Sequence, residues 1–146
     1  MKVEELHAKV GYRLSGRAQR YTEVRRSIVE RLSRSGRPLT VPEILSSAKS
    51  VPLSSAYRNL TVLLEAGVVR RVAGTDDQGR FELAEDIAGH HHHLVCEGCG
   101  TVDDVPSSTR LESVMDEAAR LAAEEQGYDV WSHRFDLIGL CRQCQG

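Results

Sequence analysis

The amino-acid sequence predicts an α+β fold with a basic, mainly helical N-terminal part and a smaller α/β C-terminal part. Three observations predict this division. Apolar residues recur at helical spacing in three segments before residue 67, and β-rich runs follow them. Residues 1–80 hold 15 Lys and Arg against 8 Asp and Glu, whereas residues 81–146 hold 4 against 13. Two C-x-x-C pairs, at 96–99 and 141–144, lie in the acidic part.

The bulk composition indicates a globular chain that stays out of the membrane. Hydrophobic residues make up 40% and charged residues 27% of 146 residues, which suits one domain or two small ones. No apolar run approaches the ~20 residues that span a bilayer. The first 14 residues contain no signal-peptide core. We therefore expect a cytoplasmic protein.

The basic part begins with two predicted helices. Residues 18–35 place apolar side chains at helical spacing, namely Tyr21, Val24, Ile28 and Leu32. Gly36 and Pro38 end this helix. Thr40 and Glu43 then form a capping box that starts a short helix, which the sequence Val-Pro at 51–52 breaks.

A third helix and a hairpin complete the basic part. Ser54 is a suitable N-cap for a helix over 54–66, which ends at Gly67. The runs VVRRVAG at 68–74 and RFEL at 80–83 flank a polar turn and predict a β-hairpin. Three helices followed by a hairpin are typical of a winged helix-turn-helix, whose third helix enters the DNA major groove. Residues 1–84 are thus predicted to be a winged-helix DNA-binding domain.

Candidates for DNA contact lie off the leucine face of the third helix or on the first predicted helix: Ser54, Ser55, Tyr57, Arg58, Arg17 and Arg20. The guanidinium of Arg58 can fork onto guanine or a phosphate. Lys49, Arg70 and Arg71 add positive charge nearby. The alternative is an ordinary helical bundle with a solvated basic face.

The acidic part follows a predicted hinge at 85–89 and runs from 90 to 146. Its pattern predicts strands over 90–96 and 101–105, a helix from Ser107 or Ser108 to about Gln126, and a third strand over 129–141. A unit of about 55 residues has a marginal core, and zinc binding and self-association are the usual remedies. We therefore expect residues 90–146 to form a dimerisation and metal-binding domain.

The four cysteines, Cys96, Cys99, Cys141 and Cys144, form two C-x-x-C pairs with 41 residues between them. Disulfides are unstable in the reducing cytosol. Two such pairs instead match a tetrahedral tetrathiolate zinc site. The wide separation implies that the zinc joins elements that are distant in sequence.

Four consecutive histidines precede the first cysteine pair. Because side chains alternate along a strand, His91 and His93 should face one way and His90 and His92 the other. One run can therefore serve two metal sites, each of which needs about four ligands. Candidates to complete them are Glu82, Asp104, Glu112 and His133. The alternatives are a polar surface strand and, for His133, a core histidine beside two aromatic residues of the same parity.

Four segments together resemble the ferric uptake regulator family of bacterial metal-sensing repressors: SSAYRNL at 54–60, RFEL at 80–83, HHHHLVCEGCG at 90–100 and SHRFDLIGLCRQC at 132–144. The resemblance covers nearly the whole chain. It implies a homodimer in which each chain joins a winged helix to an α/β dimerisation domain, with metal between them.

The resemblance also implies three metal sites. The four cysteines correspond to a structural zinc site, with one Zn²⁺ per chain. A regulatory site at the hinge corresponds to Glu82, His91 and His93, with Asp104 where some members use a further carboxylate. A second metal site in the dimerisation domain corresponds to His90, His92, Glu112 and His133.

The sequence departs from the family pattern in two places. Many members supply a regulatory-site histidine from the DNA-binding half, where this chain has Arg37 and Pro38. Zinc-sensing members often have an aspartate where Arg70 stands. The regulatory site is then either completed differently, by Asp104, Glu85 or Asp86, or less complete, and the sensed cation stays open among Zn²⁺, Fe²⁺, Mn²⁺ and Ni²⁺.

The function these features favour is a metal-responsive transcriptional repressor that binds palindromic double-stranded DNA operators as a homodimer and is not an enzyme. Two alternatives remain from the sequence. A metal buffer would bind metal without a DNA function. A zinc-dependent hydrolase would use histidines and carboxylates catalytically, but the sequence has no H-E-x-x-H motif.

Overall fold

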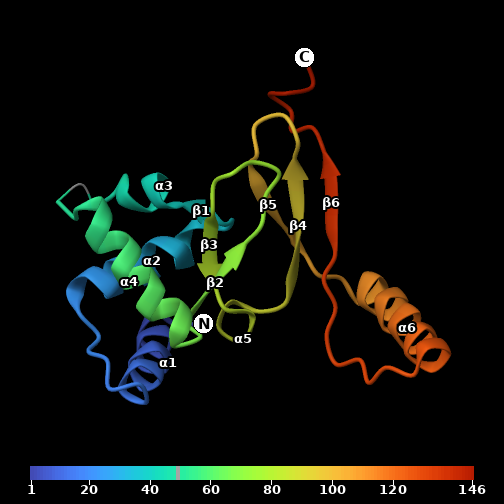
Figure 1. Cartoon of the computed structure of the whole chain (residues 1–146), viewed down its shortest axis with the longest axis horizontal. Helices are drawn as coiled ribbons and strands as arrows, with labels where there is room; N and C mark the ends of the chain where they lie inside the picture. The colour runs from blue at the N-terminus through green and yellow to red at the C-terminus, as the bar shows by residue number, and fades with distance from the viewer. Residues whose placement is uncertain (49) are drawn as a thin grey trace.

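The computed structural model describes residues 1–48 and 50–146, so Lys49 of the predicted basic surface lies outside the described residues. The fold is α+β, as predicted. Its elements are α1 (Val3–Ser15), α2 (Glu23–Ser35), β1 (Leu39–Thr40), α3 (Val41–Leu45), α4 (Leu53–Glu65), β2 (Val69–Val72), β3 (Arg80–Leu83), α5 (Glu85–Ala88), β4 (His91–Cys96), β5 (Val102–Pro106), α6 (Thr109–Gln126) and β6 (Asp136–Gly139). Figure 1 shows α1–α4 on one side, the small sheets in the middle and α6 on the far side.

The first half packs its helices against a three-stranded antiparallel sheet of order β1-β3-β2. The largest fully buried side chains of this half come from α1, α3, α4 and β1, namely Leu14, Leu39, Ile44, Leu60 and Leu63, and α2 adds the fully buried Val29. Helices followed by a β2–β3 hairpin give the predicted winged-helix arrangement. The core extends into α5, because Ile87 is buried with it.

The first half contains one helix more than the three that the sequence predicted, and this additional helix is α1. Leu6, Val10 and Leu14, spaced four residues apart, are its buried face. Helix α2 starts later than expected, after the N-cap Thr22, whose side chain accepts a hydrogen bond from a backbone N–H of the first turn. The expectation that residues 18–22 are helical was therefore wrong.

Helix α4, the expected recognition helix, starts one residue before the predicted cap. Its N-cap is Pro52, and Ser54 lies inside the first turn, so the assignment of Ser54 as N-cap was wrong. Pro52 offers no side-chain acceptor, so no side-chain cap hydrogen bond forms at this end of α4. Arg25 of α2 holds α4 in place, since its Nε donates to Asn59 Oδ1 at 2.9 Å.

The predicted capping box is present at α3. Thr40 N donates to Glu43 Oε2 at 2.8 Å, and Glu43 N donates to Thr40 Oγ1 at 3.4 Å. We expect Thr40→Ala to lower the free energy of unfolding by about 1 kcal/mol, because a helix N-terminal donor loses its partner. Urea denaturation measures this change. Thr61→Ala, at an exposed α4 position, serves as control and should stay within about 0.5 kcal/mol of wild type; equal losses would contradict the prediction.

The second half is a three-stranded sheet of order β5-β4-β6, in which β4 is antiparallel to β5 and parallel to β6. Strand β4 therefore lies in the centre, with His93 opposite Asp104 on one side and opposite Asp136 on the other. The third strand was expected over 129–141 but spans only Asp136–Gly139. Its expected first half is irregular and leaves Trp131 88% exposed.

Helix α6 begins after the N-cap Ser108 and ends at Gly127 in the left-handed conformation, in agreement with the sequence prediction. None of its residues is buried, and all four residues of β6 are exposed. Figure 1 shows α6 standing off from the sheet. Among the described helices, none is both long enough and apolar enough to span a membrane.

Candidate metal centres and DNA-binding surface

Three groups of four side chains bring potential ligand atoms within 4.8 Å of one another. We call them the cysteine cluster (Cys96, Cys99, Cys141 and Cys144), the hinge cluster (Glu82, His91, His93 and Asp104) and the helix cluster (His90, His92, Glu112 and His133). Each group contains the residues that the sequence had placed together.

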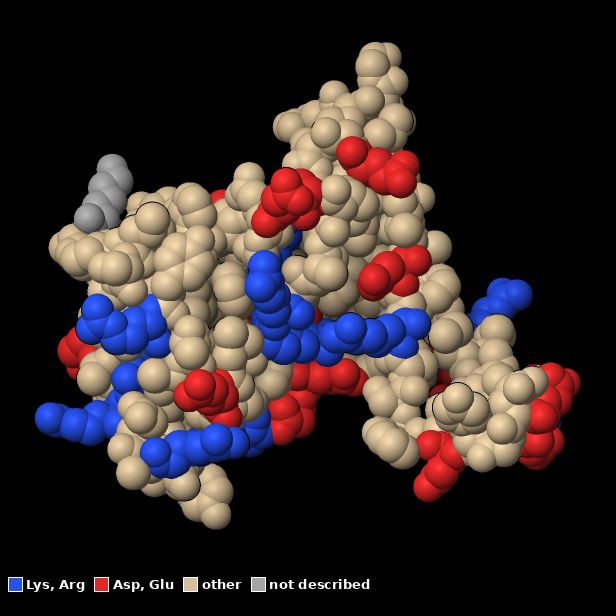
Figure 2. Space-filling view, viewed as in Figure 1, with Lys and Arg blue, Asp and Glu red and all other residues tan. Residues whose placement is uncertain are grey.

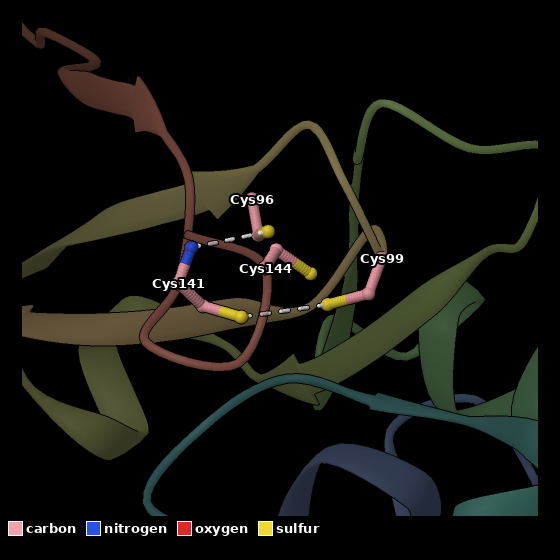
Figure 3. A group of neighbouring side chains, drawn as sticks. All are labelled: Cys96, Cys99, Cys141 and Cys144. Carbon is pink, nitrogen blue, oxygen red and sulfur yellow. Dashed lines mark hydrogen bonds between the residues drawn. The ribbon is translucent and has the colours of Figure 1, made fainter. Parts of the chain in front are cut away.

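The cysteine cluster joins the ends of two parallel strands. Cys96 is the last residue of β4, and Cys141 follows β6 by two residues. Figure 3 shows the four side chains converging from these two segments, with Cys99 Sγ 3.8 Å from Cys141 Sγ. All four cysteines are free thiols in this arrangement. The cluster therefore offers the four-sulfur donor set that structural zinc prefers.

The electrostatics of the sulfurs fit a bound cation. Backbone N–H groups of Cys141 and Cys99 lower the pKa of the Cys96 thiol to about 6. Hydrogen bonding with Cys141 and the other two sulfurs raises the pKa of Cys144 to about 12. Four thiolates so close together need a positive charge among them. Gly98 allows this approach, because a Cβ there would lie 2.8 Å from the Cys144 Cβ.

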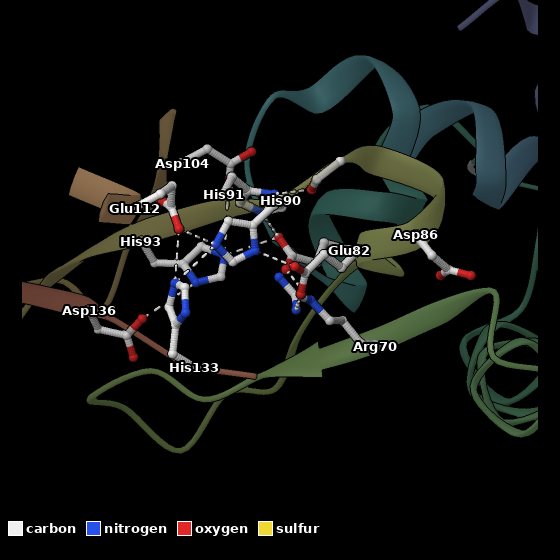
Figure 4. Close-up of polar contacts among 12 residues, drawn as sticks. Arg70, Glu82, Asp86, His90, His91, His93, Asp104, Glu112, His133 and Asp136 are labelled. Atoms are coloured by element: carbon white, nitrogen blue, oxygen red, sulfur yellow. Dashed lines mark hydrogen bonds and ion pairs between the residues drawn. The ribbon is translucent and has the colours of Figure 1, made fainter. Parts of the chain in front are cut away.

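The hinge cluster draws its ligands from both halves of the protein. Glu82 lies on β3 of the first sheet, whereas His91 and His93 lie on β4 and Asp104 on β5 of the second. Glu82 Oε2 is 2.9 Å from His91 Nε2 and 3.1 Å from His93 Nε2. Asp104 Oδ1 is 3.6 Å and 3.8 Å from the same two nitrogens. Two imidazoles and two carboxylates thus converge on one point, as Figure 4 shows for the labelled side chains.

The charges of the hinge cluster also fit a cation. Burial alone would raise the pKa of Glu82, but hydrogen bonds from His93 and His91 together with the charge of Arg70 lower it to about 2. Burial raises the pKa of Asp104. Asp104 Oδ1 is buried without a hydrogen-bond partner among the described residues. An orphaned buried acceptor beside two imidazoles matches the donor set of a divalent metal site.

Both hinge-cluster histidines are oriented by partners on their other ring nitrogen. Nδ1 of His91 is 3.0 Å from the carbonyl oxygen of Gly89. Nδ1 of His93 is 3.5 Å from Asp136 Oδ1 on β6. Such partners fix the ring and its tautomer, so that Nε2 faces the cluster as a ligand atom.

The helix cluster is centred on Glu112 of α6. Glu112 Oε1 is 2.7 Å from His92 Nε2, and Glu112 Oε2 is 3.1 Å from His90 Nε2 and 3.0 Å from His133 Nε2. The hydrogen bond from His92 lowers the pKa of Glu112. His90 Nδ1 contacts Glu85 on its other side. This group connects β4 to α6 and to the segment before β6, and His133 lies in it rather than in the apolar core.

The structure also places the residues that stand where the sequence departs from the family pattern. Arg37 turns to Glu43, with Nη2 2.8 Å from Oε1, and contributes nothing to the hinge cluster. Of the three candidates to complete that cluster, only Asp104 belongs to it. Glu85 contacts His90, and Asp86 pairs with an arginine of α1.

Sequence reasoning missed the contact between Arg70 and Glu82. Arg70 had been assigned to the basic surface, but its Nε donates to Glu82 Oε1 at 2.6 Å. The two residues are register partners in the β2–β3 hairpin. Counting back from the turn of the predicted hairpin was the signal that would have paired them.

The candidate DNA-contacting residues lie at the surface of the first half. Ser54, Tyr57 and Arg58 are exposed on α4, and Ser55 beside them is half-buried. Arg17 and Arg20 are exposed in the loop between α1 and α2, so their assignment to a helix was wrong. Figure 2 shows Lys and Arg side chains over the first half and its hairpin, and Asp and Glu side chains over α6. On the face shown, basic side chains are thus concentrated over the first half, in line with the charge division of the sequence.

A winged helix joined to a sheet that carries metal-ligating groups defines a metal-responsive transcriptional regulator. The sequence model of the Ferric uptake regulator family matches residues 17–138, and the chain belongs to this family. The family consists of transcriptional regulators and not enzymes, which excludes the hydrolase alternative.

The chain is similar in sequence to known regulators and similar in fold to solved structures of regulators. The peroxide operon regulator of Bacillus subtilis is 30% identical over 129 residues, covering 86% of this chain and 83% of the relative. The Helicobacter pylori ferric uptake regulator, described as having three functional metal binding sites, superposes with a TM-score of 0.80 at 23% identity, covering 100% and 95%. A zinc-bound manganese uptake regulator superposes with a TM-score of 0.68 at 28% identity, covering 97% and 99%.

Proposed function

We propose that the protein is a metal-dependent repressor of the bacterial cytoplasm that binds palindromic operators as a homodimer and controls metal homeostasis. Residues 1–84 are its DNA-binding domain, 85–89 its hinge and 90–146 its dimerisation and metal-binding domain. The cysteine cluster holds a structural Zn²⁺, the hinge cluster is the regulatory site, and the helix cluster is a second metal site. The regulatory cation is Zn²⁺ or Fe²⁺, with Mn²⁺ and Ni²⁺ as alternatives.

The observation that carries this proposal is the composition of the hinge cluster. Glu82 comes from the same hairpin as the wing, whereas His91, His93 and Asp104 come from the second sheet. A bound divalent cation supplies the positive charge that holds these donors together. The four side chains then fix the orientation of the DNA-binding half relative to the second sheet. Because the metal binds this orientation more tightly than orientations in which the four donors are apart, it shifts the conformational equilibrium toward it.

The exposed side chains of α4 support the DNA-binding part of the proposal. Arg58 lies on the face of α4 opposite its buried Leu60 and Leu63, and Tyr57 is exposed beside it. A helix presented in this way can enter the major groove, where an arginine reads guanine or holds a phosphate.

Exposed apolar surface in the second half supports the homodimer. It lies on α6, on β6, in the segment between them and just after β6, and comprises Val114, Leu121, Tyr128, Val130, Trp131, Leu137, Ile138 and Leu140. A monomer rarely leaves so many apolar side chains in contact with water. Strand β6 is also an edge of its sheet, with unpaired backbone groups along one side. A second copy related by a two-fold axis covers both features and aligns two recognition helices with a palindrome.

The decisive experiment measures DNA binding as a function of free metal, using duplexes selected from a random-sequence pool. A chelator mild enough to spare the cysteine cluster is expected to abolish binding, and added Zn²⁺, Fe²⁺, Mn²⁺ or Ni²⁺ at buffered concentrations to restore it. Fluorescence anisotropy at one fixed salt concentration gives the affinity. Binding that is unaffected by chelation would contradict the proposal.

Arg58→Ala provides a second arm that separates a regulator from a metal buffer. It is expected to cost about 1–3 kcal/mol of DNA-binding free energy and to leave the metal content unchanged. Arg34→Ala, which also removes one exposed arginine from the first half, controls for net charge. Equal DNA affinity of both variants and wild type would overturn the role of Arg58, whereas a wild type that binds metal but no DNA would leave metal buffering as the better reading.

A further inference from the structure

Arg70 occupies one side of the carboxylate that links the two halves. It lies directly across the β2–β3 hairpin from Glu82, and its Nε donates to Glu82 Oε1 at 2.6 Å. The Glu82 side chain is only 7% exposed and that of Arg70 is 27% exposed, so the pair is shielded from competing water. Figure 4 shows the two side chains pointing toward one another.

The two oxygens of Glu82 are divided between different partners. Oε1 faces Arg70, whereas Oε2 faces His91 Nε2 and His93 Nε2. A carboxylate can bind a metal through one oxygen or through both. Because a guanidinium does not lose its proton in proteins, it does not release Oε1 by deprotonation as a histidine or a buried lysine can.

A second carboxylate anchors the guanidinium itself. Arg70 Nη1 is 3.4 Å from Glu85 Oε2, and the other oxygen of Glu85 contacts His90 of the helix cluster. Arg70 is therefore held between two acidic side chains, one on each side. This double contact keeps the guanidinium beside Glu82.

We propose that Arg70 is a specificity-determining residue that restricts Glu82 to a single ligand oxygen and so limits the hinge cluster to four protein donors. Two imidazole nitrogens and two single carboxylate oxygens form the set that zinc accepts in tetrahedral sites. Cations such as Mn²⁺, which prefer more oxygen donors, lose the second Glu82 oxygen. This inference rests on the proposed regulatory role of the hinge cluster.

The test uses Co²⁺ as a probe, because four-coordinate Co²⁺ absorbs visible light much more strongly than six-coordinate Co²⁺. The full-length protein keeps its cysteine-bound zinc, and Glu112→Gln with His133→Ala silences the helix cluster. Arg70→Met is then compared in this background with Arg70→Lys and with Arg71→Met, the neighbouring exposed position on β2. Competition titrations give the ratio of Zn²⁺ to Mn²⁺ affinity for each protein.

Arg70→Met is expected to weaken the Co²⁺ absorption and to lower the Zn²⁺ to Mn²⁺ affinity ratio about tenfold or more, the scale at which residues behind a ligand act. Arg70→Lys retains a donor to Oε1 and should keep the parental spectrum, as should Arg71→Met. If Arg70→Met loses its far-UV circular dichroism, Arg70→Leu, which likewise offers no donor to Oε1, replaces it with the same expectation.

The outcomes separate this inference from the proposed function. A parental spectrum and affinity ratio in Arg70→Met would overturn the role of Arg70 and leave the regulatory site intact. Failure of the parental background to bind any cation beyond its zinc would overturn the regulatory role of the hinge cluster itself.

Discussion

Cys96→Ser is expected to lose the zinc of the cysteine cluster and, with it, the fold and self-association of residues 90–146. Structural zinc contributes apparent binding free energies of about 10–16 kcal/mol, which is as large as the whole free energy of unfolding of a typical domain. The second half has little core to compensate, since only Val95, Cys96 and Val102 are buried apolar residues after position 90 among those described. Removing one of four sulfurs therefore removes the main stabilising interaction of this half.

The position of Cys96 indicates that loss of the zinc would act first on the pairing of β4 with β6. It ends β4, and its Sγ accepts a hydrogen bond from Cys141 N at 3.2 Å just beyond β6. Zinc at this point holds the β4–β6 pair together, and β6 has no other buried residue with which to stay attached. Loss of β6 would also displace Asp136 from His93, so that the hinge cluster loses an orienting partner.

Metal analysis by mass spectrometry, size-exclusion chromatography and far-UV circular dichroism measure the three expected losses. Gln143→Ser provides the control, because it introduces the same serine at an exposed position between Cys141 and Cys144. It should retain one zinc per chain and the oligomeric state of the wild type. One tightly held zinc in Cys96→Ser would show that the cysteine cluster is not the structural site.

Residue spacing alone was enough to separate the two histidine pairs, because they lie on a strand whose periodicity is fixed. The assignment of Glu82, Asp104, Glu112 and His133 to one pair or the other came from the family resemblance. The alternation of a strand separates His91 and His93 from His90 and His92, and the structure has them in two different clusters. The capping box at α3 and the end of α6 at Gly127 could also be predicted from the sequence, since both depend on residues that are neighbours in the chain.

Features that depend on partners elsewhere in the chain were harder to predict. The start of β6 follows from which residues of β4 it can pair with, and only four register pairs form, so the preceding segment through Trp131 is irregular. An arginine in a basic segment is ordinarily expected at the solvated surface. The partner of Arg70 becomes visible only from the register of the hairpin, which places it opposite Glu82. Helix α1 showed the apolar spacing of Leu6, Val10 and Leu14, but its burial depends on a groove that the other helices create.

Glu82→Gln is expected to separate metal binding from DNA binding. Within the hinge cluster, Glu82 is the sole residue from the first sheet. Loss of a residue behind a ligand typically costs 10–100-fold in metal affinity, so loss of a direct ligand should cost at least about 100-fold. His91, His93 and Asp104 still offer three donors, and excess metal can fill the site without engaging the DNA-binding half.

Asp104→Asn is the matched comparison, because it also converts one cluster carboxylate to an amide but leaves Glu82 in place. Both variants should need more metal than the wild type in calorimetric titrations. At metal concentrations that saturate both, Asp104→Asn should recover operator binding, whereas Glu82→Gln should remain at the metal-free level. Since ligand count is the same in the two variants, equal recovery would mean that the first sheet is not linked to the second through Glu82, and that operator binding responds to metal by another route.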